Sequence, residues 1–370
     1  MDLYLIIVII MLALAVSGLV VGVANDAVNF LNSALGSKAA PRYVIMTVAS
    51  VGIIVGAITS NGMMEVARSG VFHPEMFTFA EVMLLFLAVM FTNVILLDIF
   101  NTLGMPTSTT VSLVVGLLGA AVGISIFKIA NDALVTLPDG SLATMADMIN
   151  TGNAMAIIGG ILISVVIAFV CGTVVMYITR LIFSFRYQSK LKSYGAVWCG
   201  IALTAISYFA VFKGLKGTQV IPADWMSWME GHIPMMLGGL LVGWSLIMSI
   251  LSMLKVNILR ITVLAGTFSL ALAFAGNDLV NFIGVFVAGV DAYDIVRTTG
   301  DTNMLMGGLN DPVVANLLIL FLSGAVMVVT LWFSKKAQSV SDTEINLARQ
   351  DVGVERFGST SASRAIVRAT

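Results

Sequence analysis

The sequence predicts an integral membrane protein that is built of α-helices. Of its 370 residues, 59% are hydrophobic and 11% are charged, whereas a soluble domain is typically about 45–50% apolar and about 25% charged. The mean hydropathy of +1.01 agrees with this contrast. The apolar stretches are long and lack the alternation of polar and apolar residues that marks barrel strands, so helices are expected to cross the bilayer.

Nine apolar segments are long enough to cross a bilayer at roughly 20 residues per span. They cover residues 3–23 with a continuation to 36, 43–60, 79–100, 107–127, 154–183, 196–213, 233–252, 258–290 and 311–333. The first segment is expected to be retained, because it carries Asp2 where a signal peptide has basic residues. Trp225, Trp228 and Trp332 fall at the expected membrane boundaries and are interpreted as interfacial anchors.

Two similar polar motifs interrupt these apolar segments. Ala24–Phe30 reads Ala-Asn-Asp-Ala-Val-Asn-Phe, and Gly276–Phe282 reads Gly-Asn-Asp-Leu-Val-Asn-Phe. An ionised group in lipid is costly unless it is paired or hydrated, so Asp26 and Asp278 are candidate functional residues. One copy alone is equally consistent with polar packing between helices. Duplication of the interruption instead indicates the binding site of a secondary transporter, formed where two repeats meet.

Each motif is expected to break its helix and to present oxygen atoms. Gly22 and Gly276 precede the breaks, and glycine tolerates unwound backbone. In a membrane, unwound backbone is permitted where it lines a cavity or binds something. Asn25 and Asn29 are four residues apart, which places both amides on one helix face beside Asp26. Such oxygens are the ligands that hard cations prefer.

A hydroxyl-rich stretch follows the third apolar segment. Asn101–Thr110 reads Asn-Thr-Leu-Gly-Met-Pro-Thr-Ser-Thr-Thr, in which Gly-x-Pro is expected to stop one helix and the hydroxyl cluster to open the next. A helix start presents unpaired N–H groups and partial positive charge, which together bind anions. Plain capping is the simpler interpretation of these hydroxyls taken alone. Beside a duplicated cation-ligand motif, an oxyanion site is favoured.

The basic residues predict an orientation, because cytoplasmic loops hold the excess of Lys and Arg. The loops after the first, third, fifth and seventh segments hold eight of them, and the alternate loops hold five. The N-terminus is therefore expected outside and the C-terminal tail in the cytoplasm. The first and eighth segments then cross in opposite directions, as an inverted repeat requires.

The expected organisation has four parts. Residues 1–127 form a first transmembrane repeat, 128–256 connecting transmembrane helices, 257–334 a second and incomplete repeat, and 335–370 a polar cytoplasmic tail. Within the tail, Ser341-Asp342-Thr343-Glu344 has the pattern of a helix start.

Several other polar residues are interpreted as structural. Glu81 and Asp98 flank the third segment and are expected to be interfacial charges, with a role for Asp98 in an ion path as the alternative. Cys171 and Cys199 lie in apolar segments and are expected to behave as small hydrophobic side chains.

Two other functional classes are excluded. His73 and His232 lie outside the membrane segments or at their edges, so a buried Ser–His dyad has no base, and no His-Glu-x-x-His zinc motif is present. A net charge of -1 argues against nucleic acid as a partner.

These motifs resemble those of the inorganic phosphate transporter (PiT) family of cation-coupled phosphate carriers. The resemblance rests on Val23–Asn29 with Leu35–Lys38, on Ala275–Asn281 with Ile283-Gly284, and on Gly104–Thr110, and it covers most of residues 1–333. It implies an inverted-repeat transporter, not an enzyme, which moves inorganic phosphate across the inner membrane by alternating access. Sodium or a proton would be the coupling ion, with no other cofactor.

The resemblance also implies roles for individual residues. The residues expected to bind coupling cations are Asn25, Asp26, Asn29, Asn277, Asp278 and Asn281. The residues expected to contact phosphate are Ser108, Thr109 and Thr110.

The chain departs from the family in one respect. Family members carry a second Pro-x-Ser-Thr-Thr element in the second repeat, and this chain shows none after Asn281. The second repeat is therefore expected to lack helices, which belong either to further sequence of the same protein or to another polypeptide. The sequence is also compatible with a homodimer. The alternative functions are a non-transporting membrane sensor or assembly subunit, or an inactive fragment of a phosphate transporter.

Overall fold

The computed structural model describes residues 2–60, 70–137, 140–184, 187–215, 221–310 and 316–347. Over these ranges the chain is helical, with isolated β-bridges pairing Phe72 with Ile149, Thr78 with Leu305 and Thr136 with Leu142. Eight helical segments in the described part are long and apolar enough to cross a membrane. The predicted all-α integral membrane protein is therefore confirmed.

The described helices follow one another along the chain in this order. They are α1 (Asp2–Asp26), α2 (Val28–Gly36), α3 (Arg42–Thr59), η1 (Pro74–Met76), α5 (Phe79–Leu103), α6 (Thr109–Ala130), α7 (Met145–Met148), α8 (Thr151–Phe183), α9 (Tyr187–Phe209), η2 (Ala210–Leu215), α10 (Ala223–Gly231), α11 (Ile233–Met253), α12 (Ile258–Asn277), α13 (Leu279–Thr299), η3 (Gly307–Asn310), α14 (Leu317–Phe333) and α15 (Lys335–Leu347).

The end of the chain differs from its prediction. Helix α14 begins at Leu317, and residues 311–315 of the ninth predicted segment lie outside the described residues. The chain bends by 66° between α14 and α15. The predicted helix start at Ser341 is wrong, because α15 begins at Lys335 and buries Ala337 and Val340 against α1, α2 and α5. Residues 348–370 of the predicted tail also lie outside the described part.

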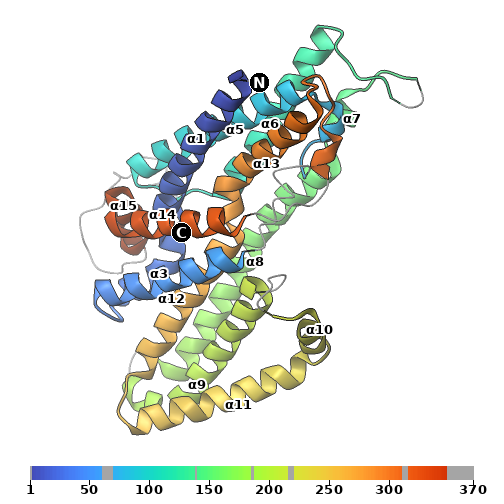
Figure 1. Ribbon diagram of the computed structural model, residues 1–370. Coiled ribbons are helices and arrows are strands. Elements are labelled where there is room, and N and C mark those ends of the chain that lie inside the picture. Colours follow the sequence, from blue (N-terminus) through green and yellow to red (C-terminus); the bar gives the residue numbers. More distant parts are fainter. Residues whose placement is uncertain are drawn as a thin grey trace, which may run out of the picture.

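The helices form an elongated bundle with two ends (Figure 1). At one end α1 packs against α5 and α13, and α5 packs against α6; at the other end α9 packs against α11 and α12. Helix α8 runs beside both groups, and in the described structure it buries Ala154 and Phe183. Most of its other apolar side chains are exposed, as expected of a helix in contact with lipid.

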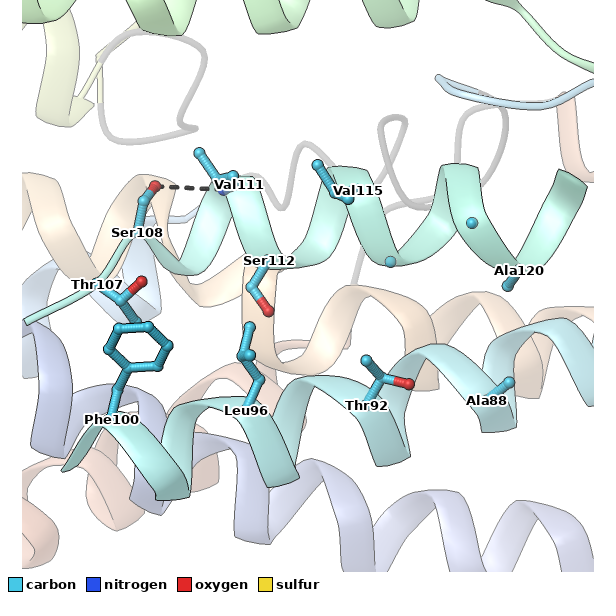
Figure 2. Close-up of a pocket in the computed structure, with 12 residues that line it drawn as sticks. Ala88, Thr92, Leu96, Phe100, Thr107, Ser108, Val111, Ser112, Val115 and Ala120 are labelled. Carbon is cyan, nitrogen blue, oxygen red and sulfur yellow. Dashed lines mark hydrogen bonds between the residues drawn. The ribbon is translucent and has the colours of Figure 1, made fainter. Parts of the chain in front are cut away.

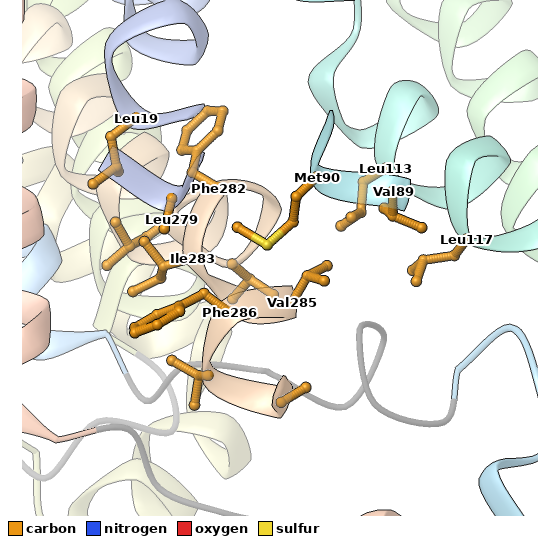
Figure 3. Close-up of a cluster of buried hydrophobic side chains, with 14 of the residues drawn as sticks. Leu19, Val89, Met90, Leu113, Leu117, Leu279, Phe282, Ile283, Val285 and Phe286 are labelled. Atoms are coloured by element: carbon orange, nitrogen blue, oxygen red, sulfur yellow. The ribbon is translucent and has the colours of Figure 1, made fainter. Parts of the chain in front are cut away.

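Most of the buried apolar side chains belong to one core. Side chains from α1, α5, α6 and α13 meet in its centre, including Leu19, Met90, Leu113 and Phe282 (Figure 3). A smaller cluster joins α9, α11 and α12 at the other end. The larger core surrounds the polar motifs, so it determines where their side chains lie.

Glycines allow α3 to approach α12 closely. A Cβ atom at Gly52 would lie 2.6 Å from the Phe268 carbonyl oxygen, and one at Gly56 would collide with the Leu272 carbonyl group. Small residues at such spacing are the usual means by which membrane helices pack backbone to backbone. The close packing brings Ser60, at the end of α3, to the second Asn-Asp motif, where its Oγ donates a 2.8 Å hydrogen bond to the Gly276 carbonyl oxygen.

We predict that Gly56→Val lowers the thermal unfolding temperature of the protein in lipid nanodiscs. Overpacking of a close contact costs about 1–3 kcal/mol. The matched control is Gly243→Val in α11, where an added Cβ meets no described atom within 4 Å. An equal shift for both variants would show that the α3–α12 contact is not as close as described.

Candidate functional site

A tight turn between α5 and α6 places the hydroxyl-rich stretch. Helix α5 ends at Leu103 and is capped by Gly104, whose φ of 67° is left-handed and suits glycine. Pro106 cannot continue a helix, and Ser108 caps α6 by accepting a 3.2 Å hydrogen bond from the Val111 N–H. The predicted stop and start of the two helices are therefore confirmed.

The first Asn-Asp motif is tied to this turn by Asn25. The Asn25 Nδ2 donates to Asn101 Oδ1 at 2.8 Å and to the Met105 carbonyl at 3.2 Å, and the Asn25 Oδ1 accepts from the Thr107 N–H at 2.7 Å. Asn101 Nδ2 in turn donates to the Val21 carbonyl at 2.7 Å. These bonds hold the end of α1 against the end of α5 and the turn that leads to α6.

The first turn of α6 contacts both motifs. The Thr109 hydroxyl donates a 2.9 Å hydrogen bond to Asp26 Oδ2. The next residue, Thr110, accepts a 3.0 Å hydrogen bond at its Oγ1 from Asn281 Nδ2. Asn281 Nδ2 also donates to Asp278 Oδ1 at 3.2 Å, and the Asp26 and Asp278 carboxylates are close enough for their charges to interact. Two motifs far apart in the sequence thus meet at one helix start.

The helices are interrupted at both motifs, but by one residue each. Ala27 separates α1 from α2 with φ −55° and ψ −30°, and Asp278 separates α12 from α13 with φ −89° and ψ −8°. These dihedral angles stay near the right-handed helical region. The interruptions are narrower than the unwound backbone that the glycines predicted.

Two of the predicted cation-binding residues lie apart from the others. The Asn29 and Asn277 side chains are exposed and form no hydrogen bond with the described site residues. Asn25, by contrast, is 1% exposed. Asn25 and Asn29 thus differ in burial, although the backbone at Ala27 between them stays near helical geometry.

A cavity of about 490 Å³ lies between α5 and α6 beside this site (Figure 2). Four residues with hydroxyl groups line it, namely Thr92, Thr107, Ser108 and Ser112, and the other lining side chains are apolar, among them Phe100 and Val115. The predicted phosphate-binding residues are thus divided. Ser108 lines the cavity, whereas the Thr109 and Thr110 hydroxyls bond to the two motifs.

Sequence reasoning did not identify two asparagines of α5 that support this region. Asn101 bonds to Asn25, and one turn of α6 beyond Ser108 the Ser112 hydroxyl donates to Asn93 Oδ1 at 2.6 Å. Asn93 and Asn101 are 6% and 1% exposed. Their eight-residue separation places them on one face of an apolar helix, and this spacing is a signal that could have found them.

Carboxylates outside the site are paired with lysines. Glu81 contacts Lys128 at 2.8 Å and Asp98 contacts Lys336, which supports their interpretation as structural charges. In contrast, no described Lys or Arg donates a hydrogen bond to Asp26 or Asp278. Among the described residues, no three His, Cys, Asp or Glu side chains converge as a transition-metal site would need. The site therefore offers oxygen ligands, which suit a hard cation.

Comparison with known proteins now places the chain in a family. A sequence model of the phosphate transporter family matches residues 22–337. The chain belongs to the phosphate transporter family. This is a family of transporters and not of enzymes, so the predicted resemblance is confirmed.

Two individual proteins resemble this family member. A candidate phosphate permease of Thermococcus kodakarensis is 25% identical over 200 residues, which are 53% of this chain and 45% of that protein. The chain thus aligns with less than half the length of this relative. A solved structure titled as a sodium-dependent phosphate transporter has a TM-score of 0.61, with 18% identity, over 92% of this chain and 82% of the other. At that identity the likeness establishes the fold.

We predict that Asn25→Leu in this phosphate transporter family member accelerates amide hydrogen exchange in residues 105–107. The substitution keeps the side-chain volume similar but removes the acceptor of the Thr107 N–H and the donor to the Met105 carbonyl. Exchange measured by mass spectrometry is expected to rise about tenfold, because the loss of a buried bond costs about 1–3 kcal/mol. The control is Asn29→Leu, whose side chain is exposed; equal protection in both variants would contradict the anchoring role of Asn25.

Proposed function

We propose that the chain carries out cation-coupled transport of inorganic phosphate across the cell membrane. Membership of the phosphate transporter family supports the substrate class. The observation that carries the proposal is the start of α6, which bonds to the Asp26 carboxylate of one motif and the Asn281 amide of the other. This arrangement places an anion-binding helix terminus directly beside two carboxylates.

Cations bind first in this proposal, at Asp26, Asp278 and Asn281. Two neighbouring carboxylates repel an approaching phosphate, and the repulsion is strong where water is scarce. A bound cation removes this repulsion. Asn25 positions the turn before α6. The side chains of Asn29 and Asn277 are exposed in this structure, and in the proposal they reach the cations after their helices rearrange. Sodium is favoured over a proton, since the similar solved structure is titled as sodium-dependent.

Phosphate then binds at the first turn of α6. The backbone N–H groups of Thr109 and Thr110 form no hydrogen bond with described residues and are available to an anion. The Thr110 hydroxyl accepts from Asn281 and so keeps its own proton to donate, and Ser108 supplies another hydroxyl from the cavity side.

The Thr109 hydroxyl links the two binding events. Its proton is donated to Asp26 in the structure described here. A cation on the Asp26 carboxylate competes for the same oxygen, which frees the hydroxyl to turn toward phosphate. Cation binding thereby raises the affinity for phosphate through one shared side chain.

Alternating access follows from movement of two repeats around this site. Residues 1–127 and 257–334 are the proposed repeats, in inverted orientation, with 128–256 connecting them. In this proposal the protein lies in the inner membrane. Its N-terminus faces outside, and its C-terminal tail lies in the cytoplasm. Ligands drive the change by binding one state more tightly than the other.

We predict that Asp26→Asn and Asp278→Asn each weaken sodium-dependent phosphate binding by more than tenfold. The neutral amide keeps the shape of the carboxylate but removes the charge that holds the cation. Binding is measured with radiolabelled phosphate on the purified chain in nanodiscs. Asp98→Asn is the control, because Asp98 pairs with Lys336 away from the site; if both site variants bind like the parent, the assigned cation roles are wrong.

We predict that phosphate uptake into proteoliposomes stops when choline replaces sodium at constant pH. An imposed pH gradient without sodium is expected to give no uptake; uptake under that gradient would assign the proton as coupling ion. Sodium-dependent binding without any flux would contradict transport and assign the chain a sensor role.

A further inference from the structure

A second, smaller cavity lies among α1, α5, α6 and α13. Its apolar wall includes Val89, Met90, Leu113, Phe282 and Val285, which belong to the buried cluster drawn in Figure 3. Two carboxamides, those of Asn93 and Asn281, also line it, and they are 6% and 8% exposed. The cavity volume of about 10 Å³ is close to the smallest that holds one water molecule.

The two carboxamides present complementary atoms without partners. Asn93 Oδ1 accepts from the Ser112 hydroxyl, but Asn93 Nδ2 has no hydrogen-bond acceptor among the described residues. Asn281 Nδ2 donates to Thr110 and Asp278, but Asn281 Oδ1 has no donor in the described part of the chain. Neither atom is fully enclosed by protein, because Thr267 Oγ1 is the fully buried side-chain N or O atom of the described residues that lacks a partner. The residues that carry this donor and this acceptor both line the one-molecule space, where water can reach them.

We propose that one water molecule binds in this cavity, accepts a hydrogen bond from Asn93 Nδ2 and donates one to Asn281 Oδ1. Water satisfies both atoms at once, because it is a donor and an acceptor. A cation fits the site less well, since it needs about six oxygen ligands. The side-chain oxygens among the residues that line this space are the two carboxamide oxygens of Asn93 and Asn281.

The water closes a ring of hydrogen bonds around the start of α6. The ring runs from Ser112 to Asn93, through the water to Asn281, and back to Thr110 of the same helix. Asn281 is then held on two sides, and it orients Asp278 through its Nδ2. Asn93 is thus a positioning residue for the second motif, and its expected effect on ligand affinity rests on the proposed function.

The direct test is a structure of the full chain in sodium, at a resolution that shows ordered water. Density within hydrogen-bonding distance of both carboxamides is expected, and it is expected to disappear in Asn93→Leu, which fills the space with a methyl group. An empty cavity in the parent overturns the proposal. Density that is lost when choline replaces sodium identifies a cation and also overturns it.

The positioning role is tested by phosphate titration at several sodium concentrations. Asn93→Leu is expected to weaken sodium-dependent phosphate binding about tenfold, the size typical of a lost partner that orients a ligand residue. Ser112→Ala, which keeps Asn93 but removes the hydroxyl that orients it, is expected to act in the same direction. The control is Ser125→Ala, whose hydroxyl bonds to the carbonyl of Ala121 in its own helix.

Unchanged sodium-dependent affinity in both variants overturns the positioning role, as does an equal loss in the Ser125 control. If the parent chain binds no phosphate, the proposed function is wrong. The positioning role of Asn93 is then tested by the structure of the Asn93→Leu variant. A displaced Asn281 side chain in Asn93→Leu then supports the positioning role, and an unmoved one overturns it.

Discussion

A carboxylate inside a membrane protein must be hydrogen-bonded, paired or hydrated, and this constraint organises the structure around Asp26. The Asp26 side chain is 4% exposed, and its described hydrogen-bond donor is the Thr109 hydroxyl. Thr109 can reach Asp26 because the turn after α5 is fixed by Asn25, Asn101 and the left-handed Gly104. One weak donor does not offset the cost of a buried charge. In the proposed function a cation supplies the missing stabilisation at Asp26, and the neighbouring helix start receives the phosphate.

The two Asn-Asp motifs have nearly the same sequence but serve the site differently. The first motif contributes its first asparagine, since Asn25 is buried and forms hydrogen bonds with the end of α5 and the turn, whereas Asn29 is exposed. The second uses its trailing asparagine, since Asn281 bonds to Thr110 while Asn277 is exposed. One helix start, α6, serves both. In the proposed function, cation binding at either carboxylate acts on the same short segment, which is the proposed route for coupling between ions and phosphate.

Features that depend on local rules could be predicted from the sequence. Gly104, Pro106 and Ser108 determine the end of α5 and the start of α6 whatever their surroundings, and the long apolar runs define the spans. Features that depend on which helices become neighbours could not be predicted. The hydrogen bond from Ser60 to Gly276 depends on the close contact of α3 with α12. The position of Asn93 opposite Ser112 depends on the packing of α5 against α6.

The central claim is that cations and phosphate occupy one connected site, and reciprocal binding tests it most directly. Phosphate affinity is measured by calorimetry across sodium concentrations, and sodium affinity across phosphate concentrations, on the chain in nanodiscs. Linkage requires that each ligand raise the affinity of the other by the same factor, and about tenfold is expected for contacts through Thr109 and Thr110. Phosphate affinity that does not change with sodium, while both ligands bind, would contradict the account.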